Sequence, residues 1–567
     1  MDLRNFLKHY CVFFLLLSIV SFVTFYYLGR PTIGIDDANI FFTYAKNVAK
    51  GYGFVFTENG ERVEGFTSLL WTLICSVFFR VSQHPEKMIM IFSLLLTTLT
   101  ITLVYKEVLI EVKEYRLQAL NKFFIFLFSG FIVAIAPGFV CWNVLSLMDN
   151  CIWTFLLIFI TVLLLQNNRQ GLSVREKTLL ITLSFLLVLA RPESMGWGLL
   201  FTLILAITDL RRHRKPWFGL LFFGFLCLFN LGLYFFRVHY FGFPLPNTYY
   251  AKVSSDRLYN LLEGGKYAFF FVIGFHPVVT VSLLALIIAS FSWIKWTATP
   301  GRSQKLAQEY YHKGPFPGFV MVTVLVIMAI GLPVLTGGDH FGGFRFYQPV
   351  LLLALWAIPA LLHLYSLSTA RDKLMLFASL VTLFFFIAAL DNMINLKTPA
   401  NRQLAIEFSL AQEGRNIAKT LNSSLPVKPS VGMIAVGGFA LEYYGKTIDL
   451  MGLNNTLMAH SSGDRKGFKN HAAFNKDVFY KLNAELLLPK QISYYKEAFT
   501  FYREVQDQSG FYNKAMKNIF NDSNFTRSYL PIVLTKNDKK IFCFAKKEET
   551  LEKAVEKLAK IRVDNKI

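Results

Sequence analysis

Long apolar segments separated by short polar ones make up the first two thirds of the chain. Many are close to the roughly 20 residues that an α-helix needs to cross about 30 Å of hydrocarbon. The expected spans are Tyr10–Leu28, Phe66–Val81, Met88–Tyr105, Lys122–Val140, Leu145–Leu165, Thr178–Ala190, Met195–Leu210, Trp217–Phe236, Val272–Trp293, Phe319–Leu335, Phe346–Tyr365 and Leu374–Leu390. This pattern predicts a polytopic α-helical membrane protein with about 11–13 transmembrane helices.

The pattern changes after Leu390, where Lys, Asn and Asp become frequent. Short apolar runs predict the strands Val431–Val436, Thr447–Leu450, Glu485–Leu488, Leu530–Thr535 and Lys540–Phe544, the last two joined by a turn at Asn537-Asp538. Gly437-Gly438 predicts a turn and Phe439–Tyr444 a turn of helix, and Glu549–Ile561 has the spacing of an amphipathic helix. We therefore expect a transmembrane catalytic domain over 1–391, with a first outer loop at 30–66, and an extracytoplasmic α/β domain over 392–567.

The net charge of +21 is carried largely by basic clusters beside apolar segments. Arg211–Lys215, Lys295–Lys313 and Arg371–Lys373 are expected on the cytoplasmic side. The first loop and the C-terminal domain then lie outside. No recognition motif accompanies the charge, which argues against nucleic acid as a partner and favours the lipid bilayer. Five of the six cysteines lie in or beside apolar segments, so no disulfide framework or Cys-X-X-Cys metal site is indicated.

The first loop, Gly34–Trp71, combines acids with an amphipathic segment. It opens with Asp36 and Asp37 and ends near a charged cluster that contains Arg62 and Glu64. One aspartate is expected to cap the next helix, because Asp is favoured at N-caps. Two acids exceed what capping requires, and partial burial at a membrane surface can raise the pKa of a carboxylate into the range of a useful base.

Three later segments also interrupt the apolar pattern, and they contain residues that can bind a ligand or take part in catalysis. Arg191 and Glu193 lie at the end of an apolar run, where the arginine can either extend to the interface or bind phosphate. The segment Phe243–Lys252 supplies tyrosines that can stack on a sugar or join an interfacial aromatic belt. In Gly337–Arg345, glycines allow close backbone approach to a ligand, and the Gly-Lys-Ser/Thr ending of a P-loop is missing.

The order of these motifs resembles that of the membrane glycosyltransferases typified by the mycobacterial terminal β-1,2-arabinofuranosyltransferase and their lipopolysaccharide-associated relatives. The resemblance is most specific in the first loop and extends to later motifs. The motifs are Asp36–Ala38, Tyr44–Asn47, Gly51–Phe56, Gly60–Trp71, Ser146–Asp149, Arg191–Glu193, Leu245–Lys252, Gly337–Asp339 and Ile448–Leu453. The chain has Ser-Leu-Met-Asp where the family has Ser-Gly-Met-Glu, and the resemblance weakens after about Ala459.

This resemblance implies a GT-C-type fold and sugar transfer from a polyprenyl-phosphate donor to a cell-envelope glycan or glycolipid. The expected catalytic acids are Asp36, as base, and Asp37. The donor phosphate is expected to bind Arg191, Lys252, His340 and Arg345. Expected substrate contacts are Arg62, Glu64, Asp149, Glu193, Asn247, Tyr249, Tyr250, Asp339, Asp449 and His460. A divalent cation can take part in such enzymes, but no ligand spacing here demands one.

Two other functions are compatible with this sequence, and the first, a transporter or flippase, would also need an apolar groove with basic residues. A transporter or flippase of lipid-linked sugars would show broken or charged segments near the membrane midplane, which the sequence does not clearly contain. A non-catalytic membrane anchor could present a carbohydrate-binding domain. We expect a multi-pass protein of the bacterial cytoplasmic (inner) membrane, with its active site facing the periplasm or exterior.

Overall fold

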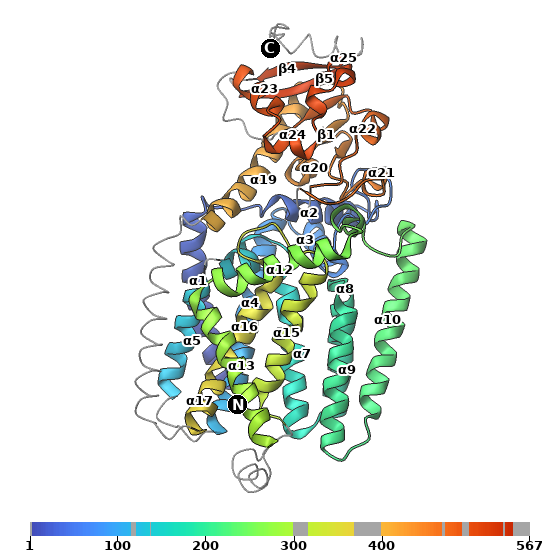
Figure 1. Cartoon of the computed structure of the whole chain (residues 1–567). Coiled ribbons are helices and arrows are strands. Elements are labelled where there is room, and N and C mark those ends of the chain that lie inside the picture. The colour runs from blue at the N-terminus through green and yellow to red at the C-terminus, as the bar shows by residue number, and fades with distance from the viewer. Residues whose placement is uncertain are drawn as a thin grey trace. The chain divides into compact units, whose positions relative to one another are not determined.

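The computed structural model describes residues 3–114, 121–136, 138–298, 316–367, 399–467, 471–489, 498–536 and 539–547 (Figure 1). The chain divides into two compact units. The first unit consists of Met1–Pro31, Met90–Leu233 and Asn260–Leu404, and the second unit of Thr32–Ile89, Tyr234–Tyr259 and Ala405–Ile567. The boundary expected between residues 391 and 392 falls in a stretch outside the described residues.

Helices form nearly all of the first unit. They are α1 (Leu3–Tyr27), α4 (Pro85–Glu114), α5 (Asn121–Ile135), α6 (Gly138–Val140), the π-helix η2 (Cys141–Leu145), α7 (Asn150–Gln170), α8 (Val174–Ala190), α9 (Ser194–Arg211), α10 (Trp217–Phe241), α12 (Arg257–Gly274), α13 (Pro277–Thr297), α15 (Gly318–Leu335), η3 (Arg345–Tyr347), α16 (Gln348–Leu353), η4 (Ala354–Trp356) and α17 (Ala357–Leu367). Helices α4, α10 and α12 each cross from one unit to the other.

Among the described residues, eight helical segments are long and apolar enough to cross a membrane, or nine if one bent pair counts as a span. The protein is therefore a multi-pass α-helical membrane protein by length and composition. Two expected spans fall short of the usual length, because α8 has 17 residues and α3 (Leu69–Val81) has 13. Leu374–Leu390 lies outside the described residues. The sequence did not anticipate helix α12.

Helix α7 is the packed centre of the first unit. In Figure 1 it runs beside α8 and α9, and it contacts both helices and α16. Most side chains of α7 are buried. In α10, by contrast, only 22% of the residues in its apolar 18-residue stretch are buried. Helix α10 therefore presents much of its apolar surface outward, as expected of a helix in contact with lipid.

The second unit combines short helices with a five-stranded sheet. Its other helices are α2 (Asp36–Ala49), α11 (Asn247–Lys252), α19 (Pro399–Ser424, beginning in the first unit), α20 (Gly437–Glu442), α21 (Thr456–Ala459), α22 (Lys476–Leu482), α23 (Ala498–Gln506), α24 (Phe511–Ala515), η5 (Ile519–Asn521) and α25 (Ser523–Ser528). The strands are β1 (Val431–Met433), β2 (Thr447–Asp449), β3 (Leu486–Leu488), β4 (Tyr529–Lys536) and β5 (Lys539–Lys546).

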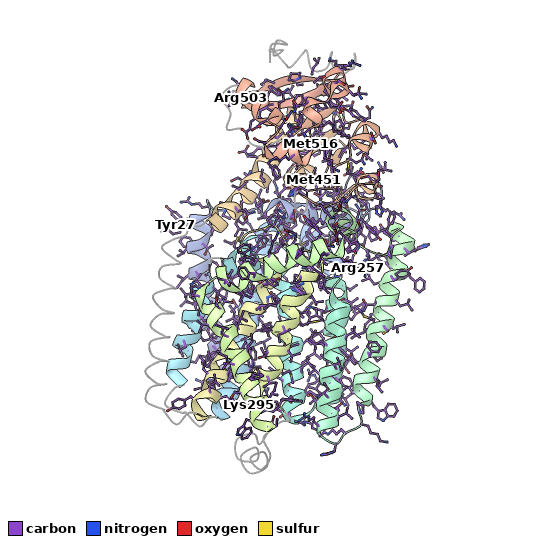
Figure 2. All side chains as sticks on the ribbon, viewed as in Figure 1. Tyr27, Arg257, Lys295, Met451, Arg503 and Met516 are labelled. Carbon is purple, nitrogen blue, oxygen red and sulfur yellow. The ribbon has the colours of Figure 1, made fainter. Side chains whose placement is uncertain are left out.

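The sheet has the strand order β2-β1-β3-β5-β4. Strand β1 pairs in parallel with β2 and β3, while β5 runs antiparallel to β3 and β4. The expected hairpin is confirmed, with Tyr529 opposite Lys546 and Lys536 opposite Lys539. Apolar side chains from the strands and helices form one core, which includes Met451 and Met516, both labelled in Figure 2.

The expected turn at Gly437-Gly438 is wrong, because helix α20 begins at Gly437. Two glycines in sequence suggest a turn, but a close approach of other backbone also requires glycine. The 26-residue helix α19 was not expected either. Asn537-Asp538 and Glu549–Ile561 lie outside the described residues.

Candidate functional site

Asp36 and Asp37 form the first turn of α2, but neither is its N-cap. Ile35 occupies that position and makes no side-chain capping bond. The expectation that an aspartate caps this helix is therefore wrong. Carboxylates in the first turn still interact favourably with the helix dipole. Asp36 is 5% exposed, whereas Asp37 is partly exposed.

The Asp36 carboxylate binds the start of a different helix. Its Oδ2 accepts the backbone N–H of Gly437 at 3.0 Å, and its Oδ1 accepts that of Gly438 at 2.8 Å. A Cβ at Gly437 would collide with the backbone oxygen of Asp36, and one at Gly438 with that of Ala411. Glycine is required at both positions because α20 approaches the backbone of its neighbours so closely.

A second buried acid, Asp449, lies at the end of β2. It accepts backbone N–H groups from Met451 and Asn454, each at 2.8 Å, and the side-chain amide of Asn454 at 2.9 Å. Burial raises the pKa of Asp449. Burial also raises the pKa of Asp36 to about 6, against the opposing effect of its two N–H donors, and the charges of Asp37 and Asp449 add to the increase.

Further polar contacts hold α2 in the second unit. Arg415 donates from Nε to Asn39 at 2.9 Å and forms an ion pair with Glu86 at 2.8 Å. The Lys46 ammonium donates to the backbone oxygen of Leu441 at 2.7 Å. Because the helix is fixed along its length, the first turn that carries Asp36 and Asp37 is fixed as well.

Glu64 forms a buried ion pair with Arg237, a residue that the sequence analysis missed. The guanidinium contacts both carboxylate oxygens, at 2.8 and 2.9 Å. Burial raises the pKa of Glu64, and Arg237 opposes that change. The backbone oxygen of Glu64 accepts the N–H of Asn247 at 2.9 Å. The Asn247 side chain in turn donates to the backbone oxygens of Gly452 and Leu453. Asn247 therefore links the segment around Glu64 to the segment that follows β2.

The other expected substrate contacts of the second unit lie among aromatic rings. His460 lies 3.9 Å from Phe243 and 4.2 Å from Tyr250, measured between ring centroids, and burial lowers its pKa. Tyr249 packs edge-on against Tyr250 and is 43% exposed. Arg62 lies over the ring of Tyr240 at 4.7 Å. Lys252 ends helix α11 and is partly exposed.

In the first unit, Arg191 follows α8 and is held by two acids. Its guanidinium contacts Asp149 at 3.2 Å and Glu193 at 2.9 Å. It also lies over the rings of Trp153 and Phe346, at 5.4 and 5.0 Å from their centroids. The Asp149 side chain is 2% exposed and that of Glu193 31%, so Glu193 is the accessible partner.

Arg345 forms a second cation site against the same aromatic ring. It is paired with the buried Asp339 and lies 5.2 Å from the centroid of Phe346. The backbone N–H of His340 also donates to Asp339, at 2.9 Å, and its ring nitrogen lies 3.3 Å from that carboxylate. Two arginines and three carboxylates therefore converge around one phenylalanine.

The structure distributes the expected site residues between the two units. The first unit brings together Asp149, Arg191, Glu193, Asp339, His340 and Arg345. The second unit contains Asp36, Asp37, Arg62, Glu64, Asn247, Tyr249, Tyr250, Lys252, Asp449 and His460. The donor-phosphate set expected from the sequence is thus divided, with Lys252 in the second unit. Within the described part of the chain, no group of three or more His, Cys, Asp or Glu side chains is arranged to hold a metal ion.

Sequence reasoning missed Arg237, Asn454 and the two helix-initiating glycines. Arg237 carried a usable signal, because a cation inside an apolar helix marks either a buried partner or a functional group. Asn454 and the glycines gave no comparable signal, since their importance depends on residues far away in sequence.

No protein-family model and no curated protein matches this sequence. Among solved structures, the chain is similar to ArnT from Cupriavidus metallidurans bound to undecaprenyl phosphate, with 11% identity and a TM-score of 0.49 over 94% of this chain and 97% of that one. It is also similar to the oligosaccharyltransferase AglB from Archaeoglobus fulgidus in complex with an inhibitory peptide and a dolichol-phosphate. That similarity has 12% identity and a TM-score of 0.43 over 94% of this chain and 74% of that one.

Proposed function

We propose that this protein is a membrane glycosyltransferase. It moves a sugar from a polyprenyl-phosphate donor to a cell-envelope glycan or glycolipid at the outer face of the cytoplasmic membrane. The observation that carries the proposal is the acid pair on α2. Asp36 is fixed by two backbone N–H groups, and this fixes the first turn that holds the partly exposed Asp37. A proton acceptor held on a rigid element is what general-base catalysis requires.

The two aspartates have different roles in this proposal. Both oxygens of Asp36 already bind α20, so Asp36 positions the helix and its charge favours proton uptake by its neighbour. Asp37 is more exposed and accepts the proton of the acceptor hydroxyl. The proposal thus moves the base from Asp36, the residue expected from sequence, to Asp37.

The reaction is a single displacement at the anomeric carbon. The acceptor oxygen loses its proton to Asp37 and forms a bond to that carbon, while the bond from the carbon to the phosphate oxygen breaks. The electron pair stays on the departing polyprenyl phosphate, whose added negative charge must be stabilised. Within the first unit, Arg191 and Arg345 are proposed to bind the phosphate of the donor, because a guanidinium binds phosphate oxygens with a fixed geometry.

For phosphate to bind Arg191, one of its two carboxylate partners must move away from the guanidinium. Asp149 is buried, whereas the Glu193 side chain is 31% exposed. We therefore propose that the donor phosphate replaces Glu193 on Arg191, while Asp149 continues to orient the guanidinium. Aromatic rings on its faces keep the arginine in place during this exchange.

The test is acceptor-dependent release of free polyprenyl phosphate by the purified protein. Asp37→Asn should reduce turnover by about 10²–10⁴-fold, the usual contribution of a general base, while it lowers thermal stability less than Asp36→Asn does. Asp36→Asn should chiefly lower stability, because an amide can accept only one of the two N–H bonds.

Three results would contradict parts of this proposal. Normal turnover in Asp37→Asn, with loss only in a stably folded Asp36→Asn, would return the base to Asp36. Normal turnover in both variants would remove the acid pair from the mechanism. Unchanged donor crossing the bilayer without acceptor-dependent cleavage would identify a flippase instead.

A further inference from the structure

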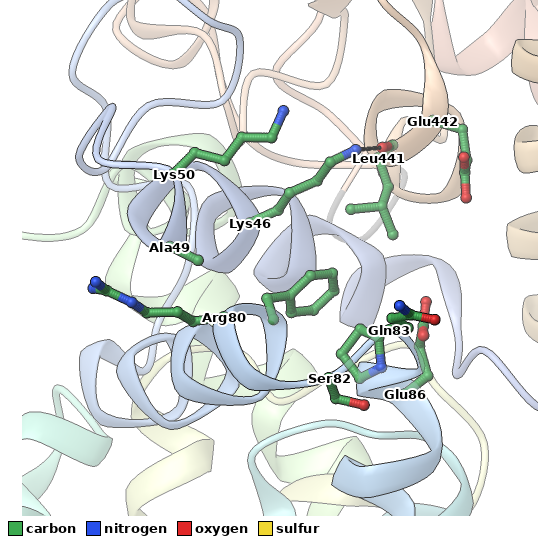
Figure 3. Close-up of a pocket in the computed structure, with 11 residues that line it drawn as sticks. Lys46, Ala49, Lys50, Arg80, Ser82, Gln83, Glu86, Leu441 and Glu442 are labelled. Carbon is green, nitrogen blue, oxygen red and sulfur yellow. Dashed lines mark hydrogen bonds between the residues drawn. The ribbon is translucent and has the colours of Figure 1, made fainter.

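A pocket of about 450 Å³ lies in the second unit, and Asp36 is not among the residues that line it (Figure 3). It lies among the last turn of α2, the end of α3, the following loop and the end of α20. Its lining residues are Lys46, Ala49, Lys50, Phe79, Arg80, Ser82, Gln83, Pro85, Glu86, Leu441 and Glu442. The proposed sugar transfer gives none of them a role.

The charges of this pocket are separated. Lys50 and Arg80 lie toward one end in Figure 3 and Glu86 and Glu442 toward the other. Two cations outside the pocket pair with these acids: Arg415 lies 2.8 Å from Glu86 and 3.7 Å from Glu442, and Lys419 lies 3.6 Å from Glu442. The charge of the acidic end is therefore balanced from outside the pocket, which leaves the basic end as its main charged feature.

The cations of the pocket have few close anionic partners. Lys46 is partly buried, and its ammonium points toward the acidic end, where it donates to a neutral backbone oxygen, that of Leu441 (Figure 3). Lys50 pairs with Glu58 at 3.2 Å, but both side chains are about half exposed and the pair is screened by water. Within the described residues, Arg80 has no ion pair or side-chain hydrogen bond. Such a group of cations favours an anionic ligand.

An apolar stripe runs along α3 toward the pocket. Leu73, Val77 and Val81 are 38%, 58% and 70% exposed and recur every four residues. They share one helix face, and Arg80, three residues after Val77, lies beside that face. A ligand that lies along this face would have an apolar chain beside the valines and a negative group at the pocket.

We propose that this pocket binds the headgroup of an anionic membrane lipid. Lys50 and Arg80 at the basic end bind its negatively charged group, and its acyl chain lies along Leu73, Val77 and Val81. The combination of charge complementarity with an adjoining apolar stripe favours a lipid over a soluble anion, which needs no such stripe. This inference does not depend on the sugar-transfer chemistry.

A structural role for these cations is the competing explanation. Both lie near the C-terminal ends of α2 and α3, where positive charge stabilises the helix dipole. The experiment therefore needs a matched control. Arg527 is also an exposed arginine in the last turn of a helix of the second unit, but it lies outside the pocket.

The test measures lipids bound to the full-length protein after reconstitution with equal amounts of phosphatidylglycerol and phosphatidylcholine, by native mass spectrometry. Phosphatidylglycerol should bind preferentially. Glycerophosphoglycerol, the same phosphodiester anion without acyl chains, should not displace it at equal concentration. The combined Lys50→Gln and Arg80→Gln substitutions should weaken binding about five-fold for each cation removed, and Arg527→Gln should leave it unchanged.

Each of three results would overturn the proposal. Equal binding of the two lipids would show that the anion is not recognised. Displacement by glycerophosphoglycerol at equal concentration would identify a soluble anion as the ligand. An equal loss in Arg527→Gln would show that the pocket cations act only through general charge. Because sugar transfer is not measured, failure of this inference remains distinguishable from failure of the proposed function.

Discussion

The acid centre of the second unit and the arginine cluster of the first unit fix buried charges in different ways. In the acid centre, Asp36 and Asp449 are bound mostly by backbone N–H groups. In the arginine cluster, Arg191 and Arg345 are bound by carboxylates and aromatic rings. Backbone donors cannot move without moving a helix or strand, whereas side-chain partners can rotate away. The first arrangement suits positioning, and the second suits exchange of an anionic ligand.

Because of this difference, we expect the loss of one partner to lower the free energy of unfolding more in the arginine cluster than in the acid centre. Arg345→Ala leaves Asp339 buried without its main cation, because the Asp339 side chain has no exposed surface. Loss of one partner of a buried ion pair costs about 3–5 kcal/mol in unfolding free energy. Thermal denaturation in detergent should show a correspondingly lower midpoint.

The double variant Asp339→Asn with Arg345→Met is the control for that prediction. It removes both charges and should recover part of the lost stability, since replacing a whole buried pair is far less costly than breaking it. Equal destabilisation in the single and double variants would contradict the view that the stranded charge is the cause.

The acid centre should instead affect how the free energy of unfolding depends on pH. Folding raises the pKa of Asp36 to about 6 from an unfolded value of about 3.9, so between these values the folded protein binds the proton more tightly. The stabilisation is complete below about pH 4 and is lost as the pH rises through about 6. The unfolding free energy should fall by about 3 kcal/mol across this window. Denaturation at a series of pH values measures it.

Asp36→Asn should reduce that pH dependence without abolishing it. Burial also raises the pKa of Asp449 and Glu64, which contribute in the same direction. An unchanged slope in the variant would show that Asp36 does not titrate in this range. A stability that increases from pH 4 to pH 6 would contradict the sign of the prediction.

The smallest expected effect concerns exchange at Arg191. Glu193→Gln removes the accessible carboxylate partner but keeps the shape of the side chain. Donor phosphate should then bind a few-fold more tightly, because the partly exposed Glu193 carboxylate no longer competes with it for Arg191. Titration with polyprenyl phosphate measures this change. Asp149→Asn is the contrasting variant and should weaken binding, since Asp149 orients the guanidinium.

Local sequence patterns were sufficient for the long apolar helices and for the β-hairpin. Apolar runs identify buried or lipid-facing helices by length, and alternating short runs around a turn signal identify β4 and β5. The same patterns gave a wrong prediction where one sequence feature, a pair of glycines, has two possible physical causes. Gly437-Gly438 was interpreted as a turn, although the glycines permit α20 to approach α2 closely.

The sequence by itself determined that the chain enters a membrane, and it identified the polar loops in which the candidate residues occur. Only the tertiary structure decided which partners these residues have. The Asp36 carboxylate meets Gly437 across 401 positions, and Glu64 meets Arg237 across 173. Hydropathy and local spacing depend on neighbours within a few turns of helix, whereas burial and pKa depend on groups that only chain folding brings together.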